Sequence, residues 1–200
     1  MPVDPREFRN CLGQFPTGVT VITCRTESGL HGATVNAFTA VSLDPPLVLV
    51  SLDRRSKACG YLAGRPFAVT VLDSAAYETA LHFAGQPKPG ADIGWADHDV
   101  APRLAGGAAW FACTPWAAYD GGDHVLYLGQ VEDYQHHPET MPLVFHGGQF
   151  RSVGDHLAAV PWLDTLDSPT CDIGWWLPGL ISSPHRVGHS SHLTAEETRT

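Results

Sequence analysis

The sequence is poor in basic residues. It holds 12 Lys and Arg against 21 Asp and Glu, which gives a formal net charge of −9 at pH 7. A chain with this balance lacks the general positive field that attracts a phosphate backbone, although a local basic pair can still hold one phosphate. We therefore expect no nucleic-acid partner.

The cysteines form no recognisable framework, because they are scattered, odd in number and without a Cys-x-x-Cys pair. They are Cys11, Cys24, Cys59, Cys113 and Cys171. Free thiols in a reducing compartment are the simplest interpretation. The histidines at 136–137, and three more between 185 and 192, lack Cys or carboxylate partners at ligand spacing. We expect no metal site.

Long apolar runs are also missing. No stretch approaches the length needed to span a bilayer, and the opening Met-Pro-Val-Asp carries no basic segment followed by an apolar one. We expect a cytoplasmic protein without membrane contact. The 200 residues, 44% of them hydrophobic, are enough for one packed domain, or for a domain with a tail.

Two extended segments joined by a proline corner stand at the centre of the pattern. Residues 32–43 are small and β-branched, 47–52 form an apolar run, and Asp-Pro-Pro between them can continue neither. Alternate residues of a strand share a face, so the first segment has Thr34, Asn36 and Phe38 on one face and Val35, Ala37, Thr39 and Val41 on the other. An amide beside a hydroxyl suits a flat heteroaromatic ligand; the alternative is an ordinary solvent-facing strand.

A candidate anion site follows directly. The chain continues Asp-Arg-Arg-Ser-Lys-Ala over residues 53–58 and then predicts a helix to about Leu62. Ser56 is a suitable N-cap, and a helix start with a hydroxyl beside Arg55 and Lys57 favours a phosphate group. Strand, strand and anion site in this order are typical of a protein that holds a phosphorylated ring.

The rest of the chain predicts mostly strands. We expect helices over residues 4–13 and 74–84, strands at 19–24, 67–72, 108–114 and 125–131, a loop over 86–99, and a hairpin over 143–153. The turn at 119–124 contains two glycines and leaves Asp123 and His124 at its rim. About seven strands with two or three helices indicate a mainly β fold, as a small closed or half-open barrel.

Sustained periodicity ends at Gly154. Residues 155–200 hold three tryptophans and several prolines without a regular pattern. We therefore expect a domain over residues 1–154 and a C-terminal extension over 155–200 that is partly irregular or disordered.

Four motifs in order carry a family resemblance. They are FPTGVTVIT at 15–23, GATVNAFTAVSLDPP at 32–46, FAVTVL at 67–72, and GDH at 122–124. Together they resemble the flavin reductase family of the FMN-binding split barrel, whose members supply reduced flavin to two-component monooxygenases. The resemblance covers about residues 5–153. It implies a homodimeric Greek-key split β-barrel with a few flanking helices and two flavin sites near the dimer interface.

The resemblance also implies a site and a reaction. The isoalloxazine ring would contact Thr34, Val35, Asn36 and Ala37, with Thr17 as an added contact. The ribityl region would contact Ser51 and Leu52, and the phosphate would contact Ser56 and Lys57. The nicotinamide would contact His124, the candidate catalytic residue. The cofactors would be FMN or FAD and NADH or NADPH. A hydride moves from nicotinamide to flavin, and the protein supplies binding and orientation.

Two features leave alternatives open. Arg54 and Arg55 make the phosphate segment more basic than in many relatives, which favours an extra phosphate, as in FAD or NADPH, or is surface charge. The extension could cover the flavin site, dock a partner or serve direct chemistry. Besides the reductase, we therefore consider a flavin-retaining enzyme of the same fold that acts on an organic biosynthetic substrate, and a flavin-binding protein without turnover.

Overall fold

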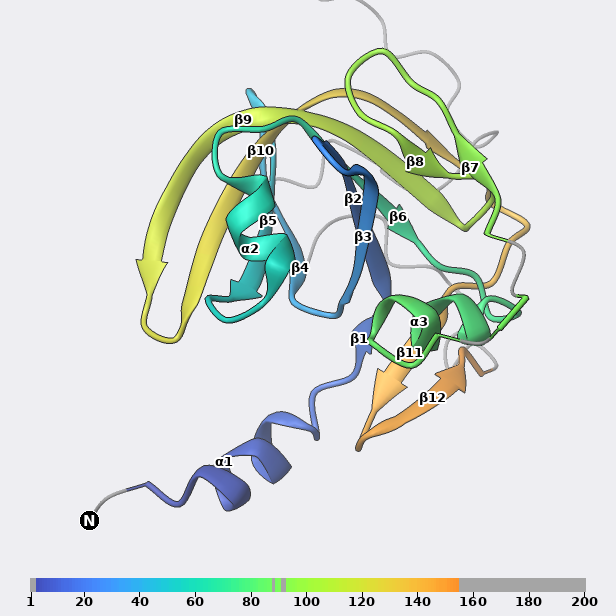
Figure 1. Ribbon diagram of the computed structural model, residues 1–200. Coiled ribbons are helices and arrows are strands. Elements are labelled where there is room, and N and C mark those ends of the chain that lie inside the picture. The colour runs from blue at the N-terminus through green and yellow to red at the C-terminus, as the bar shows by residue number, and fades with distance from the viewer. Residues whose placement is uncertain (1–2, 88, 91–92, 155–200) are drawn as a thin grey trace, which may run out of the picture. The chain divides into compact units, whose positions relative to one another are not determined.

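The computed structural model describes residues 3–87, 89–90 and 93–154 (Figure 1). The predicted C-terminal extension lies outside the described residues. In chain order the elements are α1 (Pro5–Leu12), β1 (Thr17–Gly18), β2 (Thr20–Thr26), β3 (Gly29–Val35), β4 (Phe38–Leu43), β5 (Pro46–Asp53), α2 (Lys57–Leu62), β6 (Phe67–Val71), α3 (Tyr77–Phe83), β7 (Trp95–Ala96), β8 (Arg103–Leu104), β9 (Ala109–Gly121), β10 (His124–His136), β11 (Leu143–His146) and β12 (Gln149–Ser152).

Seven strands form one antiparallel sheet in the order β3-β2-β6-β9-β10-β5-β4. Laid flat, seven strands would be about 29 Å wide. Yet β3 and β4 occupy the two opposite edges, and only Asn36 and Ala37 connect them, a link that spans about 10 Å at most. The sheet must therefore roll into a barrel, and Figure 1 shows its strong curvature. Within the described residues no ladder of hydrogen bonds joins β3 to β4, so the barrel is split there.

The predicted single strand over residues 32–43 is wrong at its middle. β3 ends at the buried Val35, β4 begins at Phe38, and both Asn36 and Ala37 between them are exposed. The break has a topological cause, because β3 pairs with β2 while β4 pairs with β5 at the other edge. The alternating faces predicted across this stretch therefore do not continue through Asn36.

Other predicted elements are present with changed limits. The Asp4 side chain caps α1 by accepting from the N–H groups of Arg6 and Glu7, and α1 has no buried residue. β9 and β10 are 13 residues long each, longer than predicted, and they form a hairpin that curves across the sheet (Figure 1). The region predicted as a loop over 86–99 contains the short strand β7. Among the described residues no helix has the length and apolar character needed to cross a membrane.

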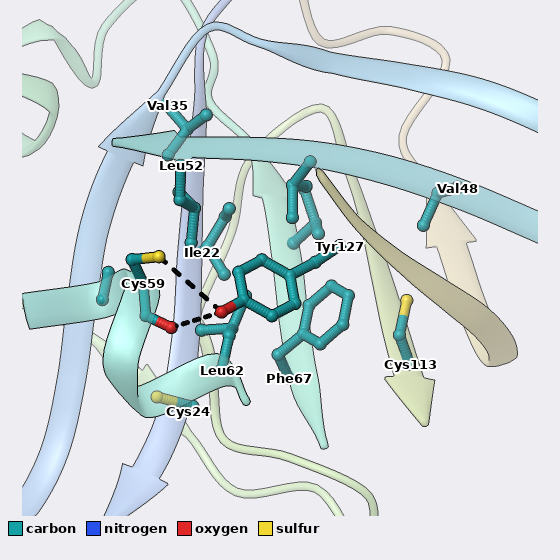
Figure 2. Packing of buried hydrophobic residues seen from close by; sticks show 13 residues of the cluster. Ile22, Cys24, Val35, Val48, Leu52, Cys59, Leu62, Phe67, Cys113 and Tyr127 are labelled. Atoms are coloured by element: carbon teal, nitrogen blue, oxygen red, sulfur yellow. Dashed lines mark hydrogen bonds between the residues drawn. The ribbon is translucent and has the colours of Figure 1, made fainter. Parts of the chain in front are cut away.

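The barrel interior is filled by one apolar cluster (Figure 2). It includes Phe67, which is 1% exposed, and Tyr127, whose hydroxyl donates to the Cys59 carbonyl oxygen at 2.6 Å. Cys59 lies in α2 and Tyr127 in β10, so this bond fastens α2 to the barrel wall. A second apolar cluster packs beside α3 and contains Val19, Val21, Leu72, Ala80, Leu104 and Leu143.

A close approach inside the barrel requires glycine at position 129. A Cβ atom on Gly129 would lie 2.5 Å from Phe67 Cζ and 2.8 Å from Cys113 Cβ. Glycine within a strand often marks such a contact. The absent side chain of Gly129 therefore makes the space that the Phe67 ring fills.

Candidate functional site

Three of the predicted site residues, Ser51, Leu52 and His124, lie where β5 ends beside the tip of the β9–β10 hairpin. Ser51 is paired with Leu126, Leu52 with Val125, and Asp53 with His124. The Ser51 N–H also donates to the Ala37 carbonyl oxygen at 3.0 Å, which brings the link between β3 and β4 to the same place. Three segments far apart in sequence thus adjoin at one end of the barrel.

His124 begins β10 and is oriented by its neighbour. Its Nδ1 lies 2.7 Å from Asp123 Oδ1, and the imidazole is 38% exposed. A carboxylate only accepts hydrogen bonds, so Nδ1 carries the proton of this bond, and Nε2 takes no part in it. A ring held in this way can bind and orient a polar ligand group without itself reacting.

Ser56 and Lys57, the residues predicted to contact a phosphate, lie at the start of α2. Ser56 Oγ accepts from the Cys59 N–H at 3.2 Å, as an N-cap does, and its own hydroxyl proton is not used in that bond. Both residues are exposed. The sequence-based N-cap prediction for Ser56 is confirmed.

The two arginines of this segment are engaged with carboxylates. Arg55 pairs with Asp53 at 2.6 Å, and this guanidinium holds the pKa of the Asp53 carboxyl well below its usual range. Arg54 pairs with Asp120 at the hairpin tip. Lys57 makes no ion pair within the described part of the chain, which leaves its ammonium group as the cation available to a ligand.

Three residues predicted to contact flavin have side chains that serve the fold instead. Thr34 Oγ1 donates to the Ala80 carbonyl oxygen at 2.7 Å. Val35 and Leu52 are buried, at 9% and 4% exposure. What Val35 and Leu52 can offer a ligand is their main chain. The hydroxyl expected beside Asn36 is therefore not that of Thr34.

Thr17, rather than Thr34, is the hydroxyl-bearing residue that shares a pocket with Asn36. Both residues line one pocket of about 490 Å³. Thr17 Oγ1 is buried and has no hydrogen-bond partner among the described residues. A buried hydroxyl without a partner is costly, so this atom fits a site completed by a polar atom of a ligand.

Sequence reasoning missed the other walls of this pocket. They come from α1 and the loop after it, and from the β11–β12 turn, and include Arg9, Asn10, Leu12, Phe15, Phe145 and Gly147. The two turn glycines at 147–148 predicted a hairpin but gave no sign that the hairpin borders a cavity. Leu12 and Phe15 are exposed, and apolar side chains left in solvent often mark a binding surface, but only the structure shows this exposure.

Residues 12–154 match the family model described as a flavin reductase like domain. The chain belongs to the flavin reductase family. It is 39% identical over 155 residues to a Rhodococcus NADH-dependent flavin reductase, covering 76% of this chain and 88% of that protein. It is 35% identical to HsaB of Rhodococcus jostii, the reductase subunit of a flavin-dependent monooxygenase, covering 83% of this chain and 87% of HsaB.

The fold of this family member matches solved flavin reductases. The native flavin reductase PheA2 superposes with a TM-score of 0.73 at 34% identity, covering 76% of this chain and all of PheA2. The resemblance predicted from four short motifs is confirmed, as is the mainly β fold class.

The described part of this family member holds no metal cluster, and two of its thiols are poorly reactive. No three His, Cys, Asp or Glu side chains among residues 3–87, 89–90 and 93–154 are placed to hold a metal ion. The four cysteines described there are free. Burial raises the pKa of the Cys24 thiol, and burial with Glu132 nearby raises the pKa of Cys113 to about 12, which makes both poor nucleophiles.

Proposed function

We propose that this protein is an NAD(P)H-dependent flavin reductase that transfers a hydride from the nicotinamide to FMN or FAD and supplies reduced flavin to a partner monooxygenase. The observation that supports the proposal is that the link before β4, the end of β5 and the start of β10 adjoin, through the Ser51–Ala37 hydrogen bond and the pairing of Asp53 with His124. The names of the two Rhodococcus relatives, an NADH-dependent flavin reductase and a monooxygenase reductase subunit, support the activity and the partner.

Each part of the flavin would have its own contacts. Asn36, Ala37, the Thr17 hydroxyl and the main chain of Thr34 and Val35 would hold the isoalloxazine ring. Ser51 and the main chain of Leu52 would contact the ribityl chain, and Ser56 and Lys57 would bind the phosphate. Bound flavin supplies the hydride acceptor. The protein contributes hydrogen bonds that fix the ring and a cation for the phosphate.

His124 orients the nicotinamide in this proposal. The Asp123 carboxylate fixes the imidazole at Nδ1, so Nε2 can hydrogen-bond the nicotinamide carboxamide. Correct stacking of two rings is the main requirement of hydride transfer, because the cofactors carry the chemistry. No nucleophile or metal is needed.

We also propose that the protein is a cytoplasmic homodimer. Exposed apolar side chains support the dimer: Phe8 is 54% exposed, Phe15 75%, Trp116 51% and Tyr119 55%. The free cysteines fit a reducing compartment. Residues 1–154 would be the flavin-binding domain and 155–200 an extension, since the family model ends at residue 154. Light scattering on the full chain at several concentrations tests the dimer.

The decisive experiment measures oxidation of NADH and of NADPH by the purified protein with FMN, with FAD and without added flavin. We expect saturable oxidation that depends on added flavin. A protein that is yellow as purified but barely oxidises either nicotinamide would be a flavin-retaining enzyme. Flavin binding without any oxidation would make it a carrier. Either result contradicts the proposal.

A further inference from the structure

Arg54 makes three contacts with the tip of the β9–β10 hairpin. Its main-chain N–H donates to the Asp123 carbonyl oxygen at 3.0 Å, and its Nε donates to the Gly122 carbonyl oxygen at 2.8 Å. Its Nη2 pairs with Asp120 Oδ2 at 2.5 Å. Asp120 Oδ1 in turn accepts from the Gly122 N–H at 3.0 Å. The guanidinium thus reaches around the turn and contacts both its backbone and its acidic side chain.

Besides Arg54, the tip is held by the β9–β10 ladder, which pairs Gly121 with His124. Gly122 and Asp123 form the two-residue turn, Gly122 has a φ of 76°, and the Asp120 and Asp123 side chains are 81% and 83% exposed. Exposed turns without apolar packing open most easily. On its β5 side the tip is paired only as far as Asp53 opposite His124, where β5 ends. Arg54 is the next residue along the chain.

The position of His124 depends on this tip. Its imidazole bonds to the Asp123 side chain, and the Asp123 carbonyl is one of the acceptors of Arg54. We propose that Arg54 is a positioning residue that clamps the hairpin tip, and His124 with it, against the end of β5, rather than a ligand for a second phosphate. This inference rests on the proposed reductase function for its kinetic consequences only.

An isolated surface ion pair would contribute little. The contacts of Arg54 differ because one planar guanidinium serves a carboxylate and a backbone carbonyl together, while the same residue's N–H bonds the next carbonyl of the turn. A lysine ammonium lacks this fork geometry. Arg54→Lys should therefore keep the charge and the main-chain hydrogen bond to Asp123 but lose the paired guanidinium contacts with Gly122 and Asp120.

The test compares Arg54→Gln and Arg54→Lys with Arg55→Gln. The control removes the same charge from the adjacent residue, whose partner is Asp53 rather than the tip. We expect both Arg54 variants to lower kcat/KM for NADH at least tenfold relative to the control, because small misplacements of an orienting group are costly. The flavin dissociation constants of Arg54→Gln and Arg55→Gln should agree within about twofold, since each variant removes one positive charge from the same segment and so weakens its attraction for the flavin phosphate alike.

Amide hydrogen exchange tests the clamp without any activity. Exchange of residues 120–124 should speed up in both Arg54 variants and stay at the wild-type rate in Arg55→Gln. Wild-type exchange at the tip in Arg54→Gln would overturn the inference. So would a selective loss of FAD against FMN, or of NADPH against NADH, because that pattern marks a phosphate ligand. A wild-type protein without reductase activity would refute the proposed function, and the exchange result would still decide the clamp.

Discussion

Replacing Gly129 with alanine should destabilise the protein by about 2 kcal/mol. The new Cβ would lie 2.5 Å from Phe67 Cζ, whereas ordinary contact begins at 3.4 Å, so the ring and the strand must separate by about 0.9 Å. Cys113 Cβ, at 2.8 Å, is fixed to the backbone and cannot rotate away. Overpacking of this kind costs about 1–3 kcal/mol, and the reduced freedom of the unfolded chain offsets about 0.4–1 kcal/mol.

Urea unfolding at one fixed protein concentration measures this cost. Gly60→Ala is the matched control, because nothing lies within 4 Å of its added Cβ and the residue is exposed within α2. That variant should gain about 0.5–1 kcal/mol from helix propensity. If Gly129→Ala unfolds at the same urea concentration as the wild type or above it, the argument that Phe67 needs this space is refuted.

Four further predictions address the site and the core. Asn36→Ala should weaken flavin binding by about 1–3 kcal/mol, measured by flavin fluorescence quenching, if its amide bonds the ring; unchanged affinity would show that the amide faces elsewhere. His124→Ala should slow hydride transfer in stopped flow while flavin affinity stays nearly intact, and His136→Ala at the far end of the same strand is its control. Arg54→Gln should lower the urea midpoint by little, since its partners are exposed, although kcat/KM falls. The free energy of unfolding should fall between about pH 9 and pH 12 and level off above. Burial raises the pKa of both Tyr127 and Cys113 to about 12, from ordinary values of 10.0 and 9.0, so the unfolded chain releases these protons at lower pH than the folded protein does. Constant stability over that range would contradict the prediction.

Features set by neighbouring residues could be predicted from the sequence. Ser56 is an N-cap because a hydroxyl there meets the N–H of Cys59, three residues on. The hairpin of β11 and β12 needs only two short strands and the two glycines between them. In both cases the interacting groups lie within ten residues of one another along the chain, so the pattern of residue types was sufficient.

Features set by distant pairing could not be predicted. The break at Asn36 exists because β3 and β4 join opposite edges of the sheet, and nothing within residues 32–43 signals it. The role of Arg54 was equally hidden, since Asp120 is 66 residues away. From the sequence, two arginines beside a helix start indicate a phosphate site. The structure shows that both are paired with carboxylates instead. Thr17 was predicted as a flavin contact because it lies in the motif at residues 15–23. That its hydroxyl is buried without a partner is visible only in the structure.

The sheet order also fixes when the proposed flavin site can form during synthesis. Ser51, Leu52 and Asp53 are held by pairing with residues 124–126, and α2 is held by Tyr127. At 5–20 residues per second, the roughly 70 residues between Lys57 and Tyr127 take about 4–14 s to translate. During that interval the phosphate segment is already complete, while the β10-facing edge of β5 has no partner among the residues made so far. A chain released before residue 124 would expose an apolar strand edge of the kind that pairs with other molecules, so premature termination should yield aggregates rather than a weakened reductase.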